Sequence, residues 1–252
     1  MDYSQFVVGI QYFNVKWPSS RGNPALKYAS LRRRGDNYWL HLENLSQSQI
    51  KDQMLDNFLN TRAWNCHIPP GSIPDLKRAV DQVSDNYAPL RNERIEETDF
   101  QKRVTLKGTQ VPIADVIDSI VSLFRQIKPK FGLVPASKLM HMAIPDLFVM
   151  LDRGIRQKYN IPKHRLVGFD KPKWWYVGFL VLMQEQASHI TETYPGSIEI
   201  GRQEAIAQIR GKHSGAPIPR LLDMANMAVR DGRLPVCETC MTKVKARWNE
   251  LR

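Results

Sequence analysis

A lysine and an aspartate stand out in a mainly apolar stretch near the middle of the chain, residues 133–159. Lys138 and Asp152 lie among leucine, methionine and phenylalanine residues, where a charge needs either an oppositely charged partner or a chemical task. In one continuous helix the two residues would be roughly 21 Å apart, too far to meet. Pro145, however, disfavours helical geometry in Ile144 and suits the first turn of a new helix. We therefore expect the chain to fold back there and to bring the lysine and the aspartate together.

The order of these residues resembles the helix-hairpin-helix DNA glycosylase superfamily: a lysine near the start of a short helix, a connection, and an aspartate followed three residues later by Ile155. The resemblance implies that Lys138 is a nucleophile that attacks the sugar carbon C1′. It implies that Asp152 relays a proton and stabilises positive charge at the sugar. The family's hairpin usually carries Gly-x-Gly before the lysine, where this chain has Val134 and Ala136. The implied function is a DNA repair glycosylase with a lyase step, acting on a base flipped out of DNA.

The same two residues allow other interpretations. A buried ion pair between Lys138 and Asp152 could orient two helices without any catalysis. The chain could also be a non-enzymatic basic helical protein that binds DNA or RNA, or a helical adaptor whose charge is incidental. The sequence leaves these alternatives open.

The positive charge of the chain is concentrated around the candidate site. The net charge is +11, and residues 128–173 hold ten Lys/Arg against three Asp/Glu. A basic surface of this kind favours a polyanion, so we predict nucleic acid, and in particular double-stranded DNA, as the partner. Trp64 could stack on a base. The predicted phosphate-binding residues are Lys128, Lys130, Arg153, Arg156, Lys163 and Arg165.

The three cysteines, Cys66, Cys237 and Cys240, indicate no disulfide framework and a reducing compartment. Cys237 and Cys240 have the spacing of metal ligands, but a lone CxxC lacks a second pair, so we expect neither a metal nor a cofactor. The chain opens without a secretory signal, and its longest apolar run, residues 177–183, is too short to span a bilayer. We expect a cytoplasmic monomer with no membrane contact.

The elements that must position the site are mainly helices of one compact domain over residues 1–252. Apolar residues at helical spacing predict helices within 46–60, from Ser72 onwards, within 111–127, 174–194, 200–209 and 218–229, and after Pro235. The central helices of residues 111–194 would carry the site. The first 45 residues form a mixed segment, in which 7–13 and 38–42 are possible short strands or extended arms. No strand periodicity follows residue 45.

Overall fold

The computed structural model describes residues 1–16, 73–126, 132–161, 175–213 and 215–250. Within these segments the protein is mainly helical, with a single two-stranded sheet, which confirms the expected fold class. The helices are α1 (Tyr3–Lys16), α5 (Ile73–Tyr87), the short 3-10 helix η3 (Ala88–Leu90), α6 (Ile113–Arg125), α7 (Leu133–Ala143), α8 (Arg153–Lys158), α9 (Trp175–Glu192), α10 (Ser197–Ile200), α11 (Arg202–Lys212), α12 (Ile218–Arg230) and α13 (Glu238–Glu250). The strands are β1 (Arg103–Leu106) and β2 (Thr109–Pro112).

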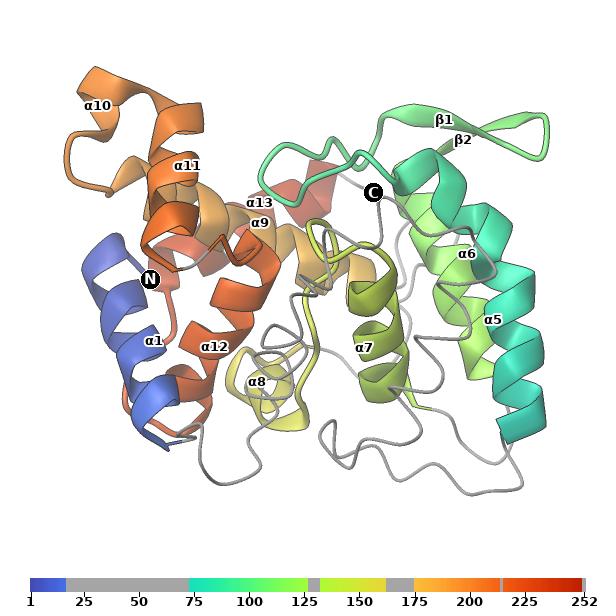
Figure 1. Ribbon diagram of the computed structural model, residues 1–252, viewed down its shortest axis with the longest axis horizontal. Coiled ribbons are helices and arrows are strands. Elements are labelled where there is room, and N and C mark those ends of the chain that lie inside the picture. The colour runs from blue at the N-terminus through green and yellow to red at the C-terminus, as the bar shows by residue number, and fades with distance from the viewer. Residues whose placement is uncertain (17–72, 127–131, 162–174, 214, 251–252) are drawn as a thin grey trace.

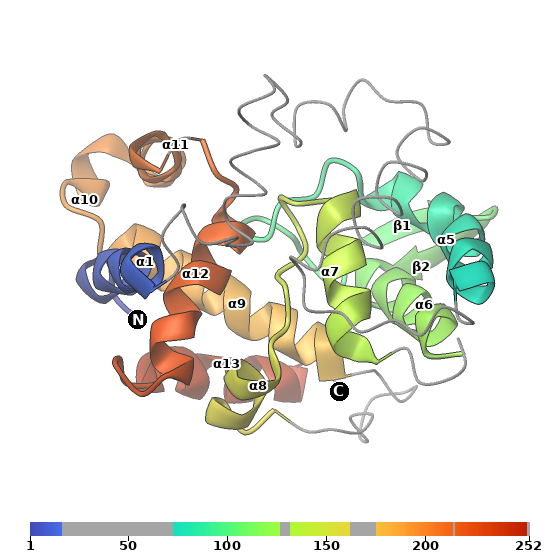
Figure 2. The same ribbon diagram turned by 60° about the horizontal axis from the view of Figure 1, so that its bottom comes forward.

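Helix α9 runs through the middle of the molecule. It lies between a group of helices formed by α1, α10, α11 and α12 and a second group formed by α5, α6, α7 and the hairpin (Figures 1 and 2). Fifteen of its eighteen residues are buried, as expected of a helix that is apolar nearly all round. One continuous hydrophobic core extends from Met1 to Val244 and includes residues of both groups. The candidate site is therefore supported by packing on both sides.

The expected strand at residues 7–13 was wrong, because this segment belongs to helix α1. Its valines and aromatic residues favour a strand in isolation. Phe6, Ile10 and Phe13 nevertheless follow a helical spacing and are all buried, and α1 packs along α12. Burial of this face against α12 outweighs the local preference for a strand. The second expected strand, residues 38–42, lies outside the described residues.

The expectation of no strands after residue 45 was also wrong. Strands β1 and β2 pair antiparallel, with Val104 opposite Val111 and Leu106 opposite Thr109. The two residues between them, Lys107 and Gly108, have positive φ angles of 49° and 80°. This is the geometry of a tight two-residue hairpin turn, in which glycine carries no steric penalty. The short Lys-Gly dipeptide is the only local signal for the hairpin.

The other helix predictions that fall on described residues are confirmed. The helices predicted from Ser72 onwards, within 111–127, 174–194, 200–209 and 218–229, and after Pro235 correspond to α5, α6, α9, α11, α12 and α13. The helix predicted within 46–60 lies outside the described part of the chain. None of the described helices is both long and apolar enough to cross a membrane.

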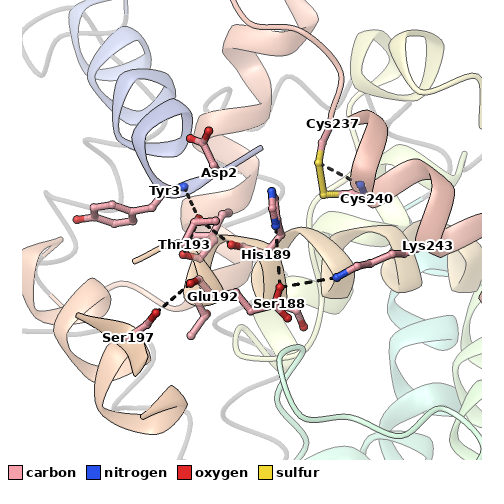
Figure 3. Close-up of polar contacts among 12 residues, drawn as sticks. Asp2, Tyr3, Ser188, His189, Glu192, Thr193, Ser197, Cys237, Cys240 and Lys243 are labelled. Carbon is pink, nitrogen blue, oxygen red and sulfur yellow. Dashed lines mark hydrogen bonds and ion pairs between the residues drawn. A yellow bond between two sulfur atoms is a disulfide. The ribbon is translucent and has the colours of Figure 1, made fainter. Parts of the chain in front are cut away.

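The structure joins Cys237 to Cys240 in a disulfide, where the sequence indicated no disulfide framework. Cys240 lies in the first turn of α13, and the CxxC spacing leaves the two Cα atoms only 5.3 Å apart. Figure 3 shows this disulfide beside the end of α9, where Lys243 forms an ion pair of 3.7 Å with Glu192. The disulfide therefore lies where α13 meets the central helix.

Candidate active site

The chain breaks its helix before Pro145 and folds back between α7 and α8, as predicted, but the new helix does not begin at Pro145. Helix α7 ends at Ala143, and the next helical residue after the short turn of residues 145–147 is Arg153. The backbone N–H of Leu151 donates a hydrogen bond of 2.9 Å to the Ser137 hydroxyl oxygen. Because Ser137 precedes Lys138 and Leu151 precedes Asp152, this contact brings the neighbourhoods of the two candidate residues together.

A second contact holds the same connection. The Nδ1 atom of His141 donates a hydrogen bond of 2.5 Å to the backbone oxygen of Phe148. His141 is fully buried, and this burial lowers its pKa to about 3 although the hydrogen bond acts in the opposite direction. The imidazole is therefore neutral at physiological pH, and it fixes the path of the chain towards Asp152.

Asp152 is the N-cap of α8. Its Oδ1 atom accepts hydrogen bonds from the backbone N–H groups of Gly154, at 2.7 Å, and Ile155, at 3.4 Å. An aspartate at this position satisfies N–H groups that have no partner within the helix. Its Oδ2 atom lies 3.5 Å from the guanidinium group of Arg230, on α12. The carboxylate is thus held from two sides.

Lys138 lies half-buried on α7. Among the residues that the structure describes, Asp152 forms its ion pair with Arg230 and none with Lys138. Both candidate residues nevertheless lie close enough to a third group, the carboxyl group of Asp223 on α12, to act on it electrostatically. The fold-back therefore brings Lys138 and Asp152 into one cluster of charges, but not into direct contact.

Asp223 is the buried centre of this cluster. Burial raises the pKa of its carboxyl group, an effect that the positive charges of Arg220, Lys138 and Arg230 oppose. Arg220, one turn earlier on the same helix, donates a hydrogen bond to Asp223. Asp223 and Arg220 thus form a buried ion pair on which Lys138, Asp152 and Arg230 act electrostatically.

The sequence did not identify the contribution of α12. Arg220, Asp223 and Arg230 are separated by three and seven residues, so they project from the same side of a helix. That spacing was visible in the sequence, but the apolar pattern of residues 218–229 indicated only a packing role. Nothing in the local sequence shows that this side of the helix faces α7 and α8.

A cavity of about 200 Å³ lies at the start of α7 and is rich in arginine. Arg153 and Arg156 were both predicted to bind phosphate, and the structure brings them together here with Arg125 from the end of α6. The guanidinium group of Arg156 lies 5.7 Å from the centre of the Trp175 ring. The residues that line the cavity are Arg125, Gly132, Leu133, Val134, Arg153, Arg156 and Trp175.

The arginine cavity, defined by these lining residues, includes close sequence neighbours of both candidate residues. Val134 lines the cavity, and Lys138 follows it by four residues on the same face of α7. Arg153 lines the cavity as well and directly follows Asp152. N–H groups in the first turn of α7 add a partial positive charge to the three guanidinium groups.

The remaining predicted nucleic-acid-binding residues lie outside the described residues: Trp64, Lys128, Lys130, Lys163 and Arg165. Arg125 and Trp175 were not predicted, although Arg125 lies only three residues before the predicted basic segment of residues 128–173. In the described segments, no group of three or more His, Cys, Asp or Glu side chains is arranged to hold a metal ion. Cys237 and Cys240 are joined to each other.

Comparison with known proteins found no matching family model, no matching curated protein and no matching solved structure.

Proposed function

We propose that this protein is a DNA glycosylase with a lyase step, in which Lys138 is the nucleophile and Asp152 its acid–base partner. The observation that carries the proposal is that the arginine cavity is lined by Val134, one helical turn before Lys138, and by Arg153, directly after Asp152. A DNA phosphate bound by Arg125, Arg153 and Arg156 would place the adjoining sugar beside these two residues.

The proposed reaction uses groups of this chain alone. The amine of Lys138 attacks C1′ of a flipped-out nucleotide, and the bond between C1′ and the base breaks. The departing base takes the bonding electron pair and a proton. The bond between C1′ and the ring oxygen O4′ then breaks, O4′ takes a proton, and C1′ and the lysine nitrogen form an imine. Loss of a proton from C2′ then drives the elimination, which breaks the bond between C3′ and its oxygen and releases the 3′ phosphate. The carboxylate of Asp152 stabilises the positive charge that develops on the sugar and relays the proton.

Covalent trapping tests the proposed chemistry. Duplexes that carry oxidised purines, deaminated bases or mismatches are incubated with the protein and sodium borohydride, which reduces an imine to a stable adduct. We expect an adduct with at least one substrate, no adduct with Lys138→Gln, and much slower base release with Asp152→Asn. Lys158→Gln, which removes an exposed lysine from α8, is the matched control and should trap normally. If none of the substrates gave an adduct, the proposed glycosylase and lyase activity would be contradicted.

Salt dependence tests the arginine cavity separately. The logarithm of DNA affinity should fall steeply with the logarithm of salt concentration, and Arg153→Gln combined with Arg156→Gln should reduce that slope by about 2. Lys77→Gln combined with Arg78→Gln removes the same charge from α5, on the outer edge of the molecule (Figure 1), and should change the slope little. If both pairs of substitutions reduced the slope equally, the arginine cavity would not be the surface that contacts DNA.

A second candidate function is non-enzymatic DNA binding. The observation that favours it is the role of Asp152 in the fold, since both of its carboxylate oxygens have structural partners, the start of α8 and Arg230. In that case Asp152→Asn and Lys138→Gln should leave DNA affinity and its salt dependence nearly unchanged, and no imine should form. Trapping and affinity measured on the same variants separate the two candidates.

A further inference from the structure

Arg230, the last residue of α12, lies directly over the start of α8. A Cβ atom added to Gly154 would be only 2.5 Å from Cγ and 2.7 Å from Cδ of Arg230. Any larger residue at position 154 would therefore displace the arginine. Glycine at this position lets the guanidinium group reach Asp152, whose Oδ2 atom is 3.5 Å away.

The arginine is also held from its other side. Its Nε atom donates a hydrogen bond of 3.0 Å to Oδ1 of Asp231. The Oδ2 atom of Asp231 in turn accepts hydrogen bonds from the Tyr12 hydroxyl group, at 2.9 Å, and the Lys16 ammonium group, at 2.5 Å. Helix α1 thus holds Asp231, and Asp231 directs the guanidinium group towards Asp152.

These hydrogen bonds keep the intermediate carboxylate charged. Partial burial raises the pKa of Asp231, but hydrogen bonds from Arg230, Lys16 and Tyr12 outweigh it and lower the pKa to about 2. Asp231 is therefore ionised at every pH at which the protein would act. A permanently charged, doubly anchored carboxylate fixes the orientation of the arginine more firmly than a neutral partner would.

We infer that Arg230 is a positioning residue for Asp152, and this inference rests on the proposed function. The N–H groups of α8 bond to one oxygen of the Asp152 carboxylate and Arg230 forms an ion pair with the other, so that both contacts favour one orientation of the group. A carboxylate fixed in this way needs no reorganisation when positive charge develops beside it. The chain Tyr12–Asp231–Arg230–Asp152 would thereby connect α1 to the reaction, although α1 itself lies outside the site.

A double-mutant cycle tests this inference. We expect Arg230→Gln to slow base release by about 100-fold, because a small displacement of a reacting group costs that much, while DNA affinity changes little. In an Asp152→Asn background the same substitution should cause little further loss, because its effect acts through Asp152. Gly154→Ala, which displaces the arginine without removing its charge, should reproduce most of the effect, and Arg230→Lys should retain part of the activity.

Arg233→Gln is the matched control, since it removes an exposed arginine three residues further on and should leave base release unchanged. Equal slowing by Arg230→Gln in both backgrounds would overturn the inference. A wild-type protein that releases no base would contradict the proposed function instead. Unfolding by urea, measured on the four proteins of the same cycle, would then decide whether Arg230 holds Asp152: additive losses of stability would show that it does not.

Discussion

The hydroxyl group of Tyr159 donates a buried hydrogen bond of 2.6 Å to Oδ1 of Asn226. The same hydroxyl oxygen accepts a hydrogen bond of 2.7 Å from Gln186, and Asn226 donates one of 2.9 Å to Gln186. These three side chains form a closed ring that joins the residue after α8 to α9 and α12. The ring fixes the far end of the short helix whose first turn is capped by Asp152.

Tyr159→Phe should reduce the free energy of unfolding by about 1–3 kcal/mol, because it leaves polar atoms of Gln186 and Asn226 buried without their partner. Urea unfolding followed by circular dichroism measures the change. Tyr194→Phe is a suitable control, since the Tyr194 hydroxyl group bonds to Gln208 in a less buried position. Tyr194→Phe should reduce the free energy of unfolding less than Tyr159→Phe does. Equal reductions would show that the ring stabilises the protein no more than a single, less buried hydrogen bond does.

The stability of the protein should decrease in mild acid because of His141. Its pKa in the folded protein is lowered to about 3, whereas a histidine in an unfolded chain titrates near 6.5. Between these values the unfolded chain binds a proton that the folded protein does not. The free energy of unfolding should therefore fall as the pH is lowered through this range, by at most about 1.4 kcal/mol per pH unit.

Urea titrations between about pH 7 and pH 4 test this prediction. His141→Asn lacks the titrating group and keeps a side-chain N–H for Phe148, so its stability should depend less on pH over this range. His189→Asn, at a less buried position on α9, should change the pH dependence less. A pH dependence that His141→Asn leaves unchanged would exclude this residue as its source.

Gly9 sets the distance between α1 and α12. A Cβ atom at this position would be 2.9 Å from both the Cα atom and the backbone oxygen of Ala225. Because backbone atoms cannot move aside cheaply, Gly9→Ala should destabilise the protein by about 1–3 kcal/mol. Gly211→Ala, in a helix with open space around it, should be neutral or stabilise by up to about 1 kcal/mol. The midpoint temperature of thermal unfolding should therefore fall for Gly9→Ala and stay unchanged or rise for Gly211→Ala.

The disulfide between Cys237 and Cys240 can be tested by counting free thiol groups. The chain has three cysteines, so denatured protein kept without reductant should react with one equivalent of a thiol reagent, located at Cys66 by mass spectrometry. Reduction should raise this count to three. Because the closed loop is short, its loss should cost only about 2 kcal/mol of stability. Three reactive thiols before reduction would show that the disulfide does not form.

The sequence predicts most of the helices, because their apolar periodicity reflects burial directly. It misassigned residues 7–13 because Val7, Val8 and Tyr12 favour a strand locally, whereas packing against α12 decides the outcome. The hairpin of β1 and β2 was missed for a related reason. Four-residue strands carry too little periodicity to be recognised, and only the turn residues distinguish them.

The candidate site was predictable where it depends on local chain geometry and not where it depends on packing between distant segments. The break at Pro145 predicts that Lys138 and Asp152 come into one neighbourhood. The role of Asp152 as the N-cap of α8 was not predicted. Asp223 and Arg230, by contrast, come from a helix more than sixty residues further along the chain. Their part in the site depends on how α12 packs, which no local pattern specifies.

The packing of α1 has a consequence for synthesis of the protein. The partner of α1 is α12, so Phe6, Ile10 and Phe13 have no complete surface to bury against until residues 218–230 have left the ribosome. The apolar face of α1 therefore lacks its main partner while about two hundred further residues are translated, which takes roughly 10–40 s at cellular rates. Chaperones that bind apolar helices would find a target in α1 during this interval.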